Sequence, residues 1–176
     1  MTLADSTKAI VQSMADEFGV DPAIIVGQIQ AESGWNPTIK NPLSTARGLI
    51  QFLDSTAQGM GFDGSLDLVT QYPDIDSQLS GPVTQYWRMY APYSNDNEFI
   101  LAVLLPAFRK KPLDTTLSPA IQKANPGLTT LGDYVTYVKK HLSSFAIVKD
   151  FLSSEGGGIS LGLLLMVGAG FMVLRK

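Results

Sequence analysis

The chain has 176 residues, a formal net charge of −3 and no cysteine. This length suits one globular domain with a short appendage, and the acidic balance gives no bulk attraction to nucleic acid. Without cysteine and with a single histidine, disulfides, thiolate or His-cluster metal sites and a cysteine nucleophile are excluded. We therefore expect no metal, no cofactor and no nucleic-acid partner, and any catalysis must rest on carboxylate, serine, lysine or tyrosine side chains.

The first residues give no targeting signal. Residues 1–7 contain no apolar stretch of the kind found in a secretory signal peptide. We therefore expect a protein that reaches its site of action by another route, as an enzyme carried in a virion or assisted by a holin would.

Two helices are predicted at the start of the chain. Apolar residues recur on one helical face over about residues 6–18, and a glycine follows. Asp21 then fits the N-cap of a second helix, with Pro22 at its first position. This second helix is apolar and continues to Glu32 or the next residue, where glycine and then proline end it.

The middle of the chain alternates short helices with loops, which predicts a mainly α fold. Turn residues indicate a loop over residues 35–48 and a loop-rich segment over 112–126. Helical spacing and caps predict further helices at about residues 54–61, 82–90, 97–108 with an interruption at Pro106, and 130–142.

The composition changes near the C-terminus. A Ser-Ser-Glu-Gly-Gly-Gly run over residues 153–158 is typical of a flexible joint, and residues 156–174 carry no charge before Arg175 and Lys176. At about 1.5 Å per residue, this stretch is near the lower limit for crossing a hydrocarbon core of about 30 Å. We predict a globular domain over residues 1–150, a linker over 151–157 and a C-terminal transmembrane helix over 158–176. The alternative is a buried C-terminal helix of the globular domain.

The most informative residues surround Glu32. Glu32 lies seven residues after Ile25 and three after Ile29, so the three share one face of the second helix. A carboxylate on an apolar face is partly desolvated, which disfavours its charged form and suits a general acid. The simpler alternative is a glutamate that makes a surface contact near a helix end.

The pattern around Glu32 resembles the active-site core of soluble lytic transglycosylases, lysozyme-like enzymes that cut bacterial cell-wall glycan. In that family the catalytic Glu is followed by Ser, then Asn-Pro, then a Gly-Leu-Met/Ile-Gln-Phe element, then Ser-Thr-Ala. Here the matching residues are Glu32, Ser33, Asn36, Pro37, Gly48, Leu49, Ile50, Gln51, Phe52, Ser55, Thr56 and Ala57. The resemblance covers roughly residues 8–142 and implies a lysozyme-like domain.

The resemblance also implies roles for single residues. Glu32 would be catalytic, and Tyr134, which opens a Tyr-Val-x-x-Val run, would hydrogen-bond near it. A third family element, Ala-Tyr-Asn, is missing, and residues 102–107 stand in its place, as in more divergent phage members. The residues expected to contact the substrate are Ser33, Gly48, Gln51, Phe52 and Tyr134.

The chemistry implied by the resemblance needs only one carboxylate. Glu32 would protonate the glycosidic oxygen between N-acetylmuramic acid (MurNAc) and N-acetylglucosamine (GlcNAc), then draw the proton from the C6 hydroxyl so that a 1,6-anhydro ring closes. A hydrolysing lysozyme would need a second acid. Asp54 and Asp63 are nearest in sequence, although a helix cap and a turn residue are simpler roles for them.

Together these features predict a membrane-anchored peptidoglycan lytic transglycosylase of a bacteriophage whose particle contains a membrane. It would open the wall locally for genome entry, or for lysis. Its partners would be glycan strands, the lipid membrane through residues 158–174 and other virion proteins. We expect a single-pass protein of the virion inner membrane or the host cell membrane. The alternative is a non-catalytic glycan-binding or structural virion membrane protein with a degenerate lysozyme-like site.

Overall fold

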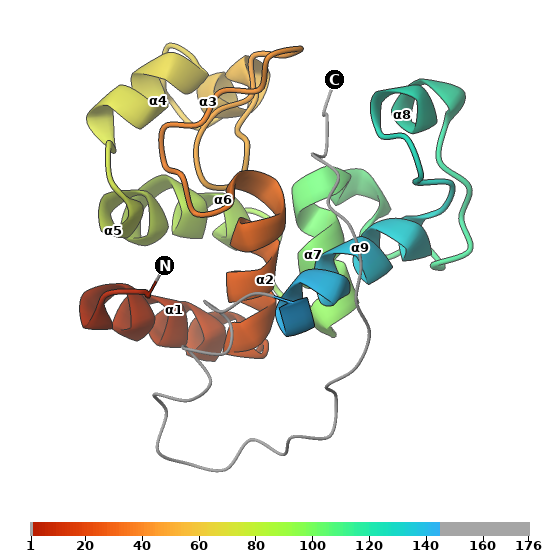
Figure 1. Ribbon diagram of the computed structural model, residues 1–176, viewed down its shortest axis with the longest axis horizontal. Coiled ribbons are helices and arrows are strands. Elements are labelled where there is room, and N and C mark those ends of the chain that lie inside the picture. Colours follow the sequence, from red (N-terminus) through yellow and green to blue (C-terminus); the bar gives the residue numbers. More distant parts are fainter. Residues whose placement is uncertain (1, 145–176) are drawn as a thin grey trace.

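The computed structural model describes residues 2–144 and shows a mainly helical fold. In Figure 1 the helix α2 lies centrally, with α1, α3, α4 and α5 on one side and α7, α8 and α9 on the other. The elements are α1 (Asp5–Phe18), α2 (Pro22–Ser33), α3 (Asp54–Gly59), α4 (Ser65–Gln71), α5 (Ile75–Gln78), the π-helical turn η1 (Leu79–Val83), α6 (Thr84–Arg88), α7 (Asp96–Leu104), the 3-10 turn η2 (Pro106–Phe108), α8 (Pro119–Ala124) and α9 (Leu131–Ser144).

The predicted bounds of α2 are confirmed, because local signals set both of its ends. The Asp21 side chain accepts a hydrogen bond of 2.8 Å from the backbone N–H of Ala23, and Pro22 occupies the first helical position. Gly34 ends the helix in the left-handed conformation, with φ of 59°. These signals place Glu32 in the last turn of the helix.

The central helix α2 is buried around its whole circumference. Ten of its twelve residues are buried, so α2 is a core helix and not an amphipathic surface helix. The helix α9 packs across it, and a Cβ added at Gly27 would lie only 2.3 Å from Cδ2 of Leu142. The missing side chain at Gly27 therefore allows the close approach of the two helices that carry the candidate site.

A cluster of aromatic rings joins α1, α6 and α7 beside this pair. The rings of Trp87 and Phe99 have centroids 4.5 Å apart, and both rings pack against Phe18. The predicted helix over residues 82–90 is regular only from Thr84 on. The turn before it is π-helical, because Pro82 has no N–H with which to continue a regular hydrogen-bond ladder.

One expectation for the middle of the chain is incomplete and another is wrong. The segment 112–126 contains a helix, α8, which Ser118 caps through the N–H of Ile121 and which begins with a proline. Six residues are too few to show an apolar period, so only the Ser-Pro cap could have revealed this helix. Asp54 does not cap α3 with its side chain, because its carboxylate instead accepts hydrogen bonds from Ser65.

The predicted linker at 151–157 and transmembrane helix at 158–176 lie outside the described residues, as do the last residues of the predicted globular domain. Within residues 2–144, no helix is long and apolar enough to cross a membrane.

Candidate active site

The carboxylate of Glu32 lies in the interior at the C-terminal end of α2. Its side chain is 5 % exposed, so the alternative of a surface contact is wrong. Its Oε1 accepts a hydrogen bond of 2.6 Å from the hydroxyl of Tyr134 and one of 3.1 Å from Nε2 of Gln28. Tyr134 lies 102 residues later in the chain, on α9. The packing of α9 on α2 therefore brings together the two residues that the family resemblance had paired.

Gln28 completes this buried group, and sequence reasoning missed it. Its Nε2 also donates to the hydroxyl oxygen of Tyr134 at 2.7 Å, so Glu32, Tyr134 and Gln28 form a closed triangle of hydrogen bonds. The signal in the sequence was a glutamine in an apolar helix, one turn before Glu32 and on the same face. Two donors on one oxygen fix the orientation of the carboxyl group, because hydrogen bonds are strong in a buried site.

The start of α9 is fixed by side chains, and this sets the position of Tyr134. Oδ2 of Asp133 accepts hydrogen bonds from the backbone N–H groups of Thr129 and Thr130, while Oγ1 of Thr130 accepts one from the N–H of Asp133. The backbone hydrogen bonds from Thr130 and Thr129 lower the pKa of Asp133 below its ordinary value. Asp133 is therefore a charged cap at neutral pH, one residue before Tyr134.

Two tyrosines of α9, Tyr134 and Tyr137, lie near Glu32 and differ in how deeply they are buried. Tyr134 is fully buried, so in this conformation it contacts Glu32 and cannot reach a glycan strand. Tyr137 is half-buried. Burial, and to a smaller extent the negative charge of Glu32, raises the pKa of Tyr137 to about 12. The hydroxyl of Tyr137 is therefore neutral at physiological pH.

In the motif loop after α2, Gly48 and Gln51 have left-handed backbone conformations. Gly48 has φ of 78° and Gln51 has φ of 55°, which is uncommon for a residue with a side chain. The Gln51 side chain is buried, and its Nε2 donates to the carbonyl oxygen of Gly48 at 3.0 Å. The amide that the sequence suggested for sugar binding is thus turned toward its own loop.

Gln78, at the end of α5, holds this loop through its side-chain amide, and the sequence analysis did not identify it. Its Oε1 accepts from the N–H of Leu49 at 2.9 Å, and its Nε2 donates to the carbonyl oxygens of Pro37 and Tyr72. A Cβ at Gly48 would lie 2.8 Å from Oε1 of Gln78. The close approach that Gly48 permits in this structure is to Gln78, not to a sugar.

The other two predicted contact residues are also inside the protein. Phe52 is 1 % exposed and packs edge-to-face on Tyr86, with ring centroids 5.9 Å apart. The hydroxyl of Ser33 donates to the carbonyl oxygen of Ile29, one turn back on α2. Of the six predicted site residues, the structure brings Glu32 and Tyr134 into direct contact. The other four, Ser33, Gly48, Gln51 and Phe52, contact residues near them in their own parts of the fold.

Both candidates for a second acid take part in local hydrogen bonds of the chain after α2. The Ser65 hydroxyl, followed by the Ser65 backbone N–H, lowers the pKa of Asp54, so this group is ionised at neutral pH. Asp63 is exposed. Its carbonyl oxygen accepts a hydrogen bond from Nε2 of Gln58, and its backbone N–H donates to Oδ2 of Asp67. Among residues 2–144, no group of three or more His, Asp and Glu side chains that could hold a metal ion is found.

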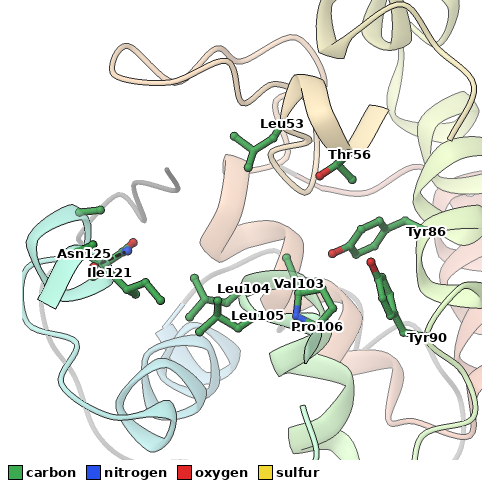
Figure 2. A pocket seen from close by; sticks show the side chains of 12 residues that line it. Leu53, Thr56, Tyr86, Tyr90, Val103, Leu104, Leu105, Pro106, Ile121 and Asn125 are labelled. Carbon is green, nitrogen blue, oxygen red and sulfur yellow. Dashed lines mark hydrogen bonds between the residues drawn. The ribbon is translucent and has the colours of Figure 1, made fainter. Parts of the chain in front are cut away.

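A cleft with a volume of about 240 Å³ lies between α3, α6, α7 and α8. Figure 2 shows Leu53 and Thr56 over it, Tyr86 and Tyr90 on one side, and the end of α7 beneath. The end of α8, with Asn125, forms the opposite side. Leu53 directly follows the 48–52 motif, so the cleft adjoins the end of the motif loop.

Comparison with known proteins agrees with this geometry. The model of the family "Transglycosylase SLT domain" matches residues 9–102, more than half of the chain, and no solved structure gives a significant match. A helical domain with a glutamate at the buried end of its central helix is consistent with the lysozyme-like class of glycan-cleaving enzymes. The chain belongs to the SLT transglycosylase family and is a lytic transglycosylase that acts on the glycan strands of peptidoglycan. The matched segment contains Glu32 and Gln28 but ends before α8 and Tyr134.

Proposed function

We propose that Glu32 cleaves the β-1,4 bond between MurNAc and GlcNAc and leaves a 1,6-anhydro end on the muramic acid. The observation that carries this proposal is the buried carboxylate held by Tyr134 and Gln28 within an SLT domain. A single carboxylate suits a reaction in which the substrate supplies its own nucleophile, whereas inverting and retaining hydrolases use two. The local hydrogen bonds from Ser65 to Oδ1 of Asp54 support the one-carboxylate reaction, because they hold this carboxylate against its own loop.

The reaction uses Glu32 first as an acid and then as a base. Protonated Glu32 gives its proton to the glycosidic oxygen, the bond from that oxygen to C1 of MurNAc breaks, and the GlcNAc side leaves as an alcohol. The acetamido oxygen of the MurNAc stabilises the positive charge at C1. The Glu32 carboxylate then takes the proton of the C6 hydroxyl while that oxygen bonds to C1, which closes the anhydro ring and restores the acid.

The test is digestion of purified peptidoglycan by the full chain and by its Glu32→Gln variant, with mass spectrometry of the products. We expect 1,6-anhydro muropeptides from the wild type and none from the variant. Because the amide can still accept the hydrogen bond from Tyr134, the variant should fold, which circular dichroism and thermal melting will check. Products with ordinary reducing ends would overturn the anhydro reaction and direct attention to Asp54 and Asp63.

We further propose that the enzyme is anchored in a membrane and carried by a bacteriophage particle. The uncharged stretch at residues 156–174, after a Gly-rich segment, supports a single-pass anchor over 158–176, a linker over 151–157 and a globular domain over 1–150. The departure from the family pattern at residues 102–107 supports a phage origin. The enzyme would sit in the virion inner membrane or the host cell membrane, beside other virion proteins, and open the wall for genome entry or lysis.

Membrane anchoring is tested by flotation of the full chain and of a chain truncated after residue 150 with lipid vesicles. The full chain should float with the lipid and resist carbonate extraction, and the truncated chain should remain at the bottom of the gradient. Flotation of neither form would refute the anchor, and absence of the protein from purified particles would refute the virion role.

A second candidate function is binding without cleavage, in a structural virion protein. The missing Ala-Tyr-Asn element favours it. Retention of Glu32 in a buried hydrogen-bonded position favours the enzyme, because a site that no longer acts has no use for a desolvated carboxylate. Binding of glycan with no product from any wall preparation would support the second candidate.

A further inference from the structure

The side chain of Gln28 is buried in α2 although only one end of its amide has hydrogen-bond partners. Gln28 is 0 % exposed, and its Nε2 donates to Glu32 and to Tyr134. Its own Oε1 is buried and has no hydrogen-bond partner among the described residues. A buried acceptor without a partner destabilises a fold, and an apolar residue would suit a helix that is buried all round. The stability of α2 therefore does not account for Gln28, and its explanation must lie in the contacts of Nε2.

The hydrogen bonds around Gln28 can run in only one direction. An amide nitrogen donates and does not accept, so the hydroxyl oxygen of Tyr134 accepts from Nε2 of Gln28, at 2.7 Å. The one hydroxyl hydrogen of Tyr134 then goes to Oε1 of Glu32, at 2.6 Å. The second amide hydrogen of Gln28 goes to the same Oε1, at 3.1 Å. Oε1 of Glu32 therefore accepts two hydrogen bonds in this group and donates none.

This fixed direction decides where a protonated Glu32 carries its proton. Without Gln28, the hydroxyl of Tyr134 could turn and accept a hydrogen bond from a proton on Oε1, because a phenol both donates and accepts. The proton of the acid would then be shared with a neighbour in the core, and it would not be available to a glycosidic oxygen. With Gln28 in place, a proton on Oε1 would face two donor hydrogens that repel it.

We propose that Gln28 is a positioning residue of the cleavage reaction, and this rests on the function proposed above. Gln28 acts through Tyr134, whose hydroxyl it holds in the donating direction, and it thereby keeps the transferable proton of Glu32 off Oε1. Gln28 is fully buried, so it does not contact the glycan itself. Its loss should therefore lower the rate of cleavage and leave the binding of glycan unchanged.

The test compares the full chain with its Gln28→Met variant, which keeps the length of the side chain and removes the amide. On soluble, uncrosslinked glycan strands, kcat should fall about three- to tenfold, the usual range for one hydrogen bond, with KM unchanged. The melting temperature should change by less than about 4 °C, because the lost donor and the removed unsatisfied carbonyl offset each other. The NMR signal of the Tyr134 hydroxyl proton, identified by its absence in Tyr134→Phe, should move upfield, because the hydroxyl loses the donor that polarises it.

Gln30→Met is the matched control, because Gln30 is half-buried on the same helix but two residues further on, where side chains face another way. This variant should keep the wild-type kcat. Because Gln28 acts through Tyr134, Gln28→Met should cost less activity in a Tyr134→Phe background than in the wild type.

Three results would overturn the positioning role: wild-type kcat in Gln28→Met, equal losses of kcat with and without the Tyr134 hydroxyl, or failure of Gln28→Met to fold, which would make the residue structural. Anhydro products formed at wild-type kcat by Gln28→Met would refute this role alone, and the proposed function would stand. If the wild type forms no anhydro products, the proposed function fails, and an unmoved Tyr134 hydroxyl signal in Gln28→Met would separately refute the fixed hydrogen-bond direction.

Discussion

The hydrogen bond between Tyr134 and Glu32 gives the sharpest test of the site. Tyr134→Phe removes only the hydroxyl that donates to Oε1 at 2.6 Å and leaves the ring in place. Both side chains are buried, so water does not readily replace the lost donor. Removing the donor of a buried acceptor costs roughly 1–3 kcal/mol, so the free energy of unfolding should fall by about that amount.

The same substitution should lower turnover more than it weakens substrate binding. Gln28 still donates to Oε1 at 3.1 Å, so the carboxylate keeps one support and loses the shorter one. A displacement of about 1 Å at a reacting group can reduce the rate roughly 100-fold, so we expect kcat to fall by about 10- to 100-fold. KM should change little, because the fully buried Tyr134 does not reach the glycan.

The assays are thermal melting and release of anhydro muropeptides. At roughly 2–4 °C per kcal/mol for a domain of this size, the melting temperature should fall by about 2–12 °C. Tyr93→Phe is the matched control, because its hydroxyl donates to the carbonyl oxygen of Trp87 at 2.7 Å in another part of the core. It should lower stability without changing kcat. Wild-type kcat in Tyr134→Phe, or strictly additive losses of stability in the double variant with Glu32→Gln, would refute the coupling of these residues.

Three further substitutions test the support around the site. Gln78→Leu leaves three backbone groups of the loop region without their partner, so we expect a loss of roughly 2–4 kcal/mol in urea unfolding, and a loss below 1 kcal/mol would contradict this role. Gly27→Val places methyl groups against Leu142 and should cost about 1–3 kcal/mol, with reduced activity because α9 moves off α2; an unchanged melting temperature would argue against that packing. Asp133→Asn should destabilise the protein at neutral pH, and because the folded-state pKa is lowered, the difference from the wild type should persist above the unfolded value of about 3.9 and vanish as pH falls through the folded one. A difference that is the same at pH 7 and pH 2.5 would exclude the charged cap.

The sequence by itself determined the parts of the protein that local signals control. Asp21, Pro22 and Gly34 set the ends of α2, because caps and left-handed glycines act within one turn of the backbone. The position of Glu32 at the end of an apolar helix follows from those signals. The likeness to the SLT family rests on the motif residues that surround and follow Glu32. The Ser-Pro cap of α8 was equally local, but the helix was too short to show a period.

Only the tertiary structure decided which partners surround Glu32. Tyr134 is separated from it by 102 residues, and Gln28 joins the pair because α9 crosses α2 at the turn where Gly27 allows a close approach. Gln51 has a side chain suited to sugars, yet its left-handed backbone turns the amide into the loop. A residue type states which hydrogen bonds a side chain can make, whereas the packing of distant helices decides which of them are made, because burial leaves each group only the partners that the fold brings within reach.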